Sequence, residues 1–203
     1  MIHPSTELKF ISPEKGFGVV ATKLIPKGTI TWIMDPLDQI FSSNDIKKLD
    51  PFFQDLLATY SYRDGNGDFI LCWDNARFVN HSFHSNCIST AYNFELAVRD
   101  IKVGEELTDD YGYLNITEPF ECLPEPNTTR KKVFPDDLLH YHSEWDSQLI
   151  EAFKYFDKVP QVFLKYIDKR YSEKVKRVAA GHAEMDSILN LYYKGAQKVL
   201  AAH

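Results

Sequence analysis

The spacing of apolar residues changes near residue 120, and this change constrains the fold more than any other feature. Residues 1 to about 120 hold short apolar runs broken by Gly, Asn, Asp and Pro. From about residue 135 onwards, apolar residues recur every three or four positions and glycine is rare. Short interrupted runs are typical of strands joined by turns, and the later spacing is typical of amphipathic helices. The sequence therefore predicts an α+β chain with small strands first and helices last.

Several segments of the first region predict specific elements. A glycine turn running into a strand is expected at Gly16-Phe17-Gly18. Residues 29–34, which are β-branched or apolar, and residues 89–98 predict two further strands. Residues 64–67 predict the turn of a hairpin. Residues 44–58 predict two short helical segments, the second starting at Pro51.

The second region predicts three helices that pack on each other and on the first region. Their apolar stripes run from Leu138 to Phe156, from Val162 to Ile167 after Pro160, and from Met185 to Val199 after Gly181. The Pro-containing segment between the regions is typical of a linker. We therefore expect a domain at residues 1–118, a linker at 119–134 and a helical region at 135–203.

Bulk properties narrow the possible partners. The 203 residues carry a net charge of −6, from 29 acidic and 23 basic side chains, which argues against direct nucleic-acid binding and is compatible with a basic protein segment. Three cysteines indicate a reducing compartment rather than a disulfide framework. Neither a membrane-spanning run nor a signal peptide is evident, so we expect a soluble intracellular protein with no membrane partner.

Three short segments carry candidate chemistry. The first is Lys15-Gly16-Phe17-Gly18, which holds the glycine turn and could let backbone press on a ligand. The second, residues 75–82, places polar side chains among apolar ones, and these need hydrogen-bond partners. The third, residues 104–113, gathers acidic residues around a tyrosine. His81 and His84 lack supporting ligands at metal-binding spacing, so no metal site is expected. Singly, the three segments also fit a plain turn, a buried polar network and a solvated acidic turn.

Taken together and in order, these segments resemble the SET-domain family of protein lysine methyltransferases. The middle one reads R-F-x-N-H-S at residues 77–82, and the last reads E-L-T-x-D-Y at residues 106–111. The resemblance covers roughly residues 7–118. It implies a mainly β SET-domain fold of small β-sheets, with the last two segments threaded in a pseudoknot. It also implies S-adenosyl-L-methionine as the cofactor and a protein or peptide substrate presenting a lysine.

The resemblance also implies roles for individual residues. The catalytic residue would be Tyr111. The residues at the cofactor would be Gly16, Phe17, Gly18, Asn80 and His81, with Arg77 nearby and mainly structural. The walls of the lysine channel would be Tyr60, Tyr62, Asp109 and Tyr113, although Tyr60 and Tyr62 fit a core role equally well.

The chain departs from the family pattern in three places. Residues 83–86 read F-H-S-N where many members have C-x-P-N. Only Cys122 remains of the cysteine cluster that binds zinc after the catalytic tyrosine, and one cysteine cannot make such a site. The helical region could then close the channel instead. Asp109 stands where the family usually has Phe or Tyr; it could bind the lysine ammonium, which would oppose reaction, or face solvent. The number of methyl groups added therefore stays open.

Two other functions compete with the enzyme. The first is a catalytically inactive SET-fold module that binds a protein partner. The second is a hydrolase that uses His81 with Asp109 or Asp110, but it lacks a nucleophile in a suitable context. The presence of Tyr111, Asn80 and His81 favours the methyltransferase. The substrate protein, the target lysine and the oligomeric state do not follow from the sequence.

Overall fold

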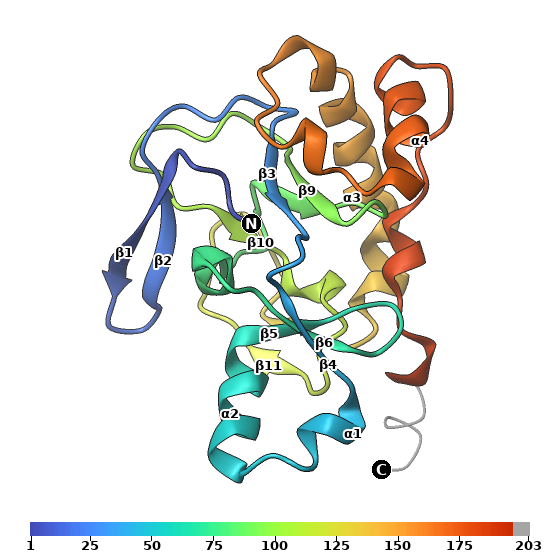
Figure 1. Cartoon of the computed structure of the whole chain (residues 1–203). Coiled ribbons are helices and arrows are strands. Elements are labelled where there is room, and N and C mark those ends of the chain that lie inside the picture. The colour runs from blue at the N-terminus through green and yellow to red at the C-terminus, as the bar shows by residue number, and fades with distance from the viewer. Residues whose placement is uncertain (197–203) are drawn as a thin grey trace.

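The computed structural model describes residues 1–196, in which the strands form several small sheets rather than one large one (Figure 1). The central sheet has the order β3-β9-β8, with all neighbours antiparallel. Its strands are β3 (Ile30–Ile33), β8 (Cys87–Ser89) and β9 (Phe94–Ala97). This mixture of small sheets and helices confirms the predicted α+β fold.

The prediction of one strand over residues 89–98 is wrong, because the chain turns between β8 and β9. Asn93 has a φ of 61°, a left-handed conformation that Asn tolerates better than most residues. Thr90 closes the turn, since both its backbone N and its hydroxyl donate to the carbonyl of Phe94 at 2.8 and 2.7 Å. The turn places Ser89 opposite Glu95.

A second antiparallel sheet, of order β4-β6-β5, lies with two helices at the lower end of the molecule in Figure 1. Its elements are β4 (Gln39–Phe41), β5 (Ser61–Arg63), β6 (Phe69–Leu71), α1 (Ser43–Ile46) and α2 (Pro51–Tyr60). The predicted hairpin at residues 64–67 and the predicted start of a helix at Pro51 are confirmed. Asp64 holds the turn by accepting hydrogen bonds from the backbone of Asn66 and Asp68.

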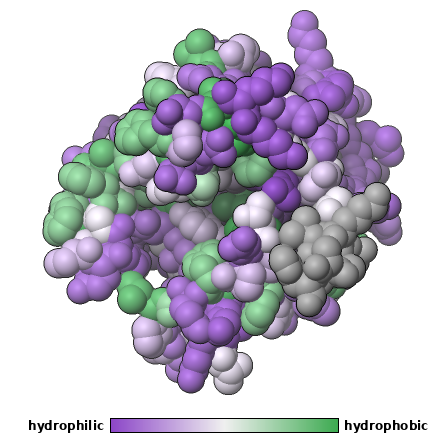
Figure 2. Space-filling model, turned by 90° about the horizontal axis from the view of Figure 1, so that it is seen from below, coloured by the Kyte–Doolittle hydropathy of each residue, from purple (hydrophilic) through white to green (hydrophobic). Residues whose placement is uncertain are grey.

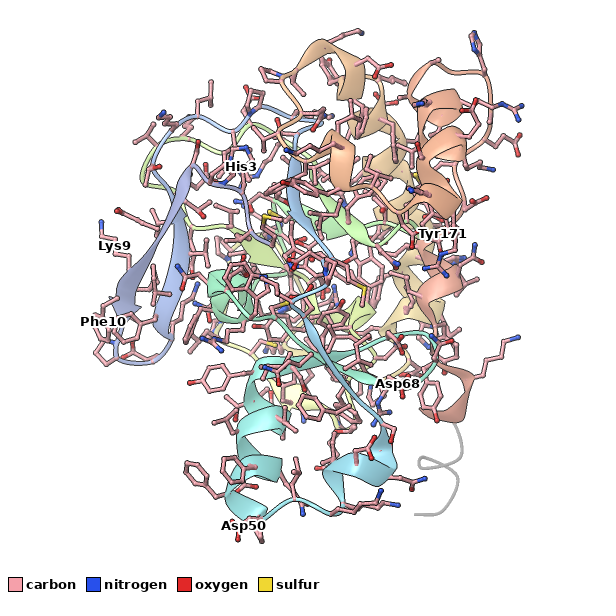
Figure 3. All side chains as sticks on the ribbon, viewed as in Figure 1. His3, Lys9, Phe10, Asp50, Asp68 and Tyr171 are labelled. Carbon is pink, nitrogen blue, oxygen red and sulfur yellow. The ribbon has the colours of Figure 1, made fainter. Side chains whose placement is uncertain are left out.

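The hairpin of β1 (Thr6–Ser12) and β2 (Gly16–Ala21) projects from one side of the molecule (Figure 1). Gly16 has a φ of 74°, which permits the turn that the sequence predicts there. Phe10 lies on its outer part (Figure 3) and its ring packs edge-on against Phe17, with both side chains exposed.

The second and third chemical segments run side by side. β7 (Asn80–His81) pairs in parallel with β10 (Thr108–Asp109), so that His81 lies opposite Asp109. The pairing continues where the backbone N of Ser82 donates to the carbonyl of Asp109 at 2.9 Å. The short helices η1 (Asn75–Phe78) and η2 (Tyr111–Tyr113) flank the pair. This contact joins the two segments that the resemblance expects to be threaded together.

The linker and the first C-terminal helix are regular. Residues 119–134 hold a small hairpin of β11 (Phe120–Glu121) and β12 (Lys132–Val133). The predicted helix beginning near Leu138 is confirmed as α3 (Asp137–Phe153). Its buried side chains, among them Trp145, share one hydrophobic core with the central sheet. The helical region is therefore packed against the sheet. None of the helices within residues 1–196 is long and apolar enough to cross a bilayer.

The second predicted helix starts later than expected. Within residues 162–167 there is only a short 3-10 turn. The helix α4 (Lys169–Ala179) begins after Asp168, whose side chain accepts a hydrogen bond from the backbone N of Arg170. Gln161 holds the preceding segment in place, because its side chain bonds the backbone of Gly28 and Ile30 at 2.7 and 3.0 Å. These bonds tie the segment before α4 to the backbone at the start of β3. The 3-10 turns here are η3 (Phe156–Lys158) and η4 (Leu164–Tyr166).

The third predicted helix is wrong within the described residues. Its stripe forms only the 3-10 turns η5 (Ile188–Leu191) and η6 (Lys194–Ala196), and Val199 lies outside the described residues. Asp146 of α3 accepts from the backbone N of Ile188 at 2.8 Å. Asn115 donates to the carbonyl of Leu191 and accepts from the backbone N of residue 193, at 2.8 and 2.9 Å. Bonds to distant side chains thus occupy backbone groups that a helix would pair internally.

Candidate functional site

Tyr111 is where the two paired segments meet. Its hydroxyl donates to the backbone carbonyl of Val79 at 2.6 Å, and its backbone N donates to Nδ1 of His81 at 3.2 Å. Both contacts depend on the parallel pairing of β7 and β10, which brings residues about 30 positions apart together. Burial raises the pKa of the Tyr111 hydroxyl, so it stays protonated at neutral pH.

His81 is neutral and has one unused donor. Burial lowers the pKa of its imidazole to about 4. Because Nδ1 accepts from Tyr111, the ring proton resides on Nε2, and this buried atom has no hydrogen-bond partner within residues 1–196. Aromatic rings surround it, with centroids of Phe83 and Phe120 at 4.5 and 6.0 Å. A buried unpaired N–H of this kind is unusual and points to a ligand acceptor.

The glycine turn is tied to both other segments through Asn80. The side-chain amide of Asn80 donates to the carbonyl of Phe17 at 3.0 Å and to Oε1 of Glu106 at 2.7 Å. Lys15 pairs with the other oxygen of Glu106 at 3.0 Å. A Cβ at Gly18 would lie 2.4 Å from Glu106 Oε1, so any larger residue there forces neighbouring side chains to move. Sequence analysis missed this ion pair, although both of its members lie within the segments it selected.

Tyr111 also lines a cavity of about 620 Å³. The lower face of the molecule is hollowed (Figure 2). Of the residues predicted for the site, those that line the cavity are Tyr60, Tyr62, Arg77, Asp109, Tyr111 and Tyr113. Gly16, Phe17, Gly18, Asn80 and His81 are not part of this lining. The predicted residues thus form two groups, which Tyr111 joins.

The side chains in the cavity wall differ in their ring packing and in their exposure to solvent. Tyr62 packs edge-on against Trp32, with ring centroids 5.9 Å apart. Tyr60 packs against Phe78 at 5.4 Å and keeps more of its surface exposed. Arg77 is exposed, and its guanidinium lies over the ring of Phe78 at 5.4 Å. These side chains can close around an extended apolar chain such as that of lysine.

Asp109 is buried, so the interpretation that it faces solvent is wrong. It is 5% exposed, and its Oδ1 lies 3.1 Å from the hydroxyl of Tyr113. That hydroxyl is also 3.1 Å from the carbonyl of Cys87. Tyr113 is itself 1% exposed, so it acts mainly by holding Asp109. Glu95, which sequence analysis missed, lies beside Asp109 in the wall and carries no local motif that could have identified it.

The C-terminal region completes the cavity wall. Arg170 and Tyr171 of α4 and Leu191 of η5 line it, as does Asp68, which precedes β6. Tyr171 and Asp68 are labelled in Figure 3. The presence of Arg170, Tyr171 and Leu191 supports the hypothesis that the helical region helps close the channel.

Arg130 of the linker fastens the segment that carries Tyr111. Its guanidinium forms ion pairs with the buried carboxylates of Asp110 and Asp137. It also lies between two rings, 4.3 Å from the centroid of Phe83 and 4.2 Å from that of Tyr141. Burial raises the pKa of Asp110, and Arg130 opposes this shift. Sequence analysis gave no role to Arg130.

Within residues 1–196, no group of three or more His, Cys, Asp or Glu side chains is placed to hold a metal ion.

Comparison with known families agrees with this geometry. Residues 16–112 match the family model described as the SET domain, and this range holds the glycine turn, the paired strands and Tyr111. A search of curated proteins found no significant match to the chain.

Proposed function

Since this chain carries a SET domain and so belongs to the SET-domain family, we propose that it transfers a methyl group from S-adenosyl-L-methionine to a lysine side chain of a protein. The observation that carries the proposal is the position of Tyr111. Its backbone N contacts His81, which follows Asn80 in β7, and its side chain lines the aromatic-walled cavity. A transferase needs such a junction, because the two substrates must meet at one point.

The residues on the first side fit the cofactor. When bound, S-adenosyl-L-methionine supplies an electrophilic methyl group on a positively charged sulfonium. The unpaired Nε2–H of His81 can donate to an acceptor of the cofactor. A Cβ built on Gly16 meets nothing within 4 Å, so the turn leaves open space beside the exposed ring of Phe17. The aromatic faces near His81 can attract a cation.

The cavity addresses the main chemical difficulty, which is the charge on lysine. Its usual pKa of about 10.4 means that the neutral amine costs roughly 4–5 kcal/mol near pH 7. Burial between Tyr62, Trp32 and Tyr111 disfavours the ammonium and lowers that pKa. The hydroxyl of Tyr111 donates a hydrogen bond to the backbone carbonyl of Val79, so the lone pairs on its oxygen remain available to orient the amine.

The inactive binding module has one observation in its favour. The carbonyl of Phe17, which the resemblance places at the cofactor, already accepts a hydrogen bond from Asn80. The hydrolase has less support, because Nε2 of His81 contacts no nucleophile within residues 1–196. The carboxylate of Asp110 is already paired with Arg130.

Calorimetric titration with S-adenosyl-L-methionine separates the enzyme from the module. Saturable one-to-one binding that Asn80→Ala weakens is expected, whereas no binding up to millimolar cofactor would favour the module. Transfer of a labelled methyl group to lysine peptides then tests catalysis. Tyr111→Phe is expected to lose most of the rate while staying folded, and the exposed Tyr166, outside the cavity, supplies the matched control Tyr166→Phe. Equal rates in both variants would remove Tyr111 from its role.

A further inference from the structure

A pair of buried carboxyl groups lines the cavity that ends at Tyr111. Glu95 lies on β9 and Asp109 on β10, and they are 7% and 5% exposed. The charge of Glu95 raises the pKa of Asp109, so the two carboxyl groups act on each other. Because two neighbouring buried carboxylates repel each other, at least one of them is expected to hold a proton. The pair therefore carries one negative charge or none.

The groups around the pair are mostly neutral. Ser89 Oγ lies 3.3 Å from Glu95 Oε1, and the hydroxyl of Tyr113 lies 3.1 Å from Asp109 Oδ1. None of the ion pairs within residues 1–196 involves Glu95 or Asp109. The titratable groups that interact electrostatically with Glu95 or Asp109 are Tyr62, Cys72, Cys87, Asp110, Tyr111, Tyr113 and the N-terminal ammonium of Met1.

The surroundings favour the protonated form. Burial raises the pKa of Glu95 to about 7, and the ammonium of Met1 opposes this shift. Burial also raises the pKa of Asp109, and the charge of Glu95 raises it further. Near neutral pH the pair thus lies close to the point at which it can take up or release a proton.

We propose that the Glu95–Asp109 pair accepts the proton that a substrate lysine must lose before its amine attacks a methyl group. This inference rests on the proposed function. One N–H bond of the ammonium breaks and its electron pair stays on nitrogen, while an O–H bond forms on the ionised oxygen of the pair. The ammonium becomes a neutral amine, the pair becomes fully protonated, and the proton later leaves to water.

Desolvation makes this transfer feasible at neutral pH. In water the pKa values of lysine and a carboxylic acid differ by about six units, so a carboxylate is a poor acceptor. Burial in one cavity lowers the pKa of the amine and raises the pKa of the carboxyl, so the two pKa values move closer together. The same surroundings disfavour the ammonium–carboxylate ion pair, which answers the objection that a charged Asp109 would hold lysine in its unreactive form.

The test is the pH profile of methyl transfer to a peptide library with one central lysine, measured from pH 5.5 to 10. The wild-type rate is expected to rise with an inflection near 7, the pKa given above for Glu95, and to level off. In the double variant Glu95→Gln with Asp109→Asn, loss of the proton acceptor is expected to lower the rate at pH 7 about a hundredfold. The rate should then recover towards pH 10, as lysine deprotonates by itself. The control variant Glu105→Gln, outside the cavity, should keep the wild-type inflection.

The outcomes separate the two proposals. A double variant that loses the same fraction of its rate at every pH has lost structure only, and this overturns the inference while the methyltransferase stands. A wild-type protein that methylates no peptide overturns the proposed function and the inference with it. If the double variant does not fold, carbon-13 NMR titration of the wild-type carboxyl groups decides. One carboxyl titrating near pH 7 is expected, and none above pH 6 would overturn the inference.

Discussion

Arg130→Met is expected to destabilise the protein strongly, because it removes the partner of two buried carboxylates. The side chains of Asp110 and Asp137 are 0% and 5% exposed, and that of Arg130 is 16% exposed. Met keeps much of the packing between Phe83 and Tyr141 but supplies no charge. Breaking a buried ion pair by removing one partner costs about 3–5 kcal/mol. For a chain of this size, such a loss lowers the melting temperature by roughly 10 °C.

The assay is thermal and urea unfolding of matched variants across pH. Lys132→Met is the control, since Lys132 belongs to the same linker but pairs with Glu121 at the surface, where a pair is worth about 1 kcal/mol or less. Without Arg130 the pKa of Asp110 rises further, so the folded variant gains a proton that the unfolded chain lacks. The loss of unfolding free energy in Arg130→Met, relative to wild type, should therefore become smaller as the pH falls towards 5. Equal losses in the two variants, or a deficit independent of pH, would refute the reasoning.

Three further predictions concern the paired segments. Gly18→Ala places a Cβ 2.4 Å from Glu106 Oε1 and 2.8 Å from Ile11, so unfolding free energy should fall by about 1–3 kcal/mol; an unchanged denaturation midpoint would contradict this. Asn80→Ala removes the bonds to Phe17 and Glu106 and should weaken cofactor binding by about 1–3 kcal/mol; an unaltered calorimetric Kd would exclude that contribution. Burial lowers the pKa of His81 to about 4, so the unfolded state binds more protons below pH 6.5. The contribution of neutral His81 to the free energy of unfolding, about 3 kcal/mol, should be lost as the pH falls through 4. A difference in unfolding free energy between wild type and His81→Gln that does not change with pH would rule this out.

Local residue chemistry explains where prediction succeeded. The hairpin at residues 64–67 and the helix starting at Pro51 follow from turn and capping residues that act within a few positions. The apolar stripe of α3 faces the shared core, so its spacing identified it correctly. The three chemical segments could be selected because their residues are consecutive.

Prediction failed where the backbone bonds to distant side chains. Asp146 and Asn115 bond to backbone groups that the predicted third helix would have paired internally. Gln161 instead anchors the segment before α4 to the backbone of Gly28 and Ile30. An apolar stripe records which residues are buried, and 3-10 turns bury the same residues as a helix. Asn93 divided one expected strand into two for a similar reason, since a single left-handed residue leaves the apolar pattern intact.

The sequence by itself determined the fold class and the segments that match the SET-domain model, and it selected Tyr111, Asn80 and His81 as candidate site residues. Only the tertiary structure decided what those residues contact. Glu95 meets Asp109, and Arg130 meets Asp110, through elements that lie 14 and 20 positions apart. Burial then sets the protonation of each group, and burial depends on every element packed around it rather than on the neighbours in sequence.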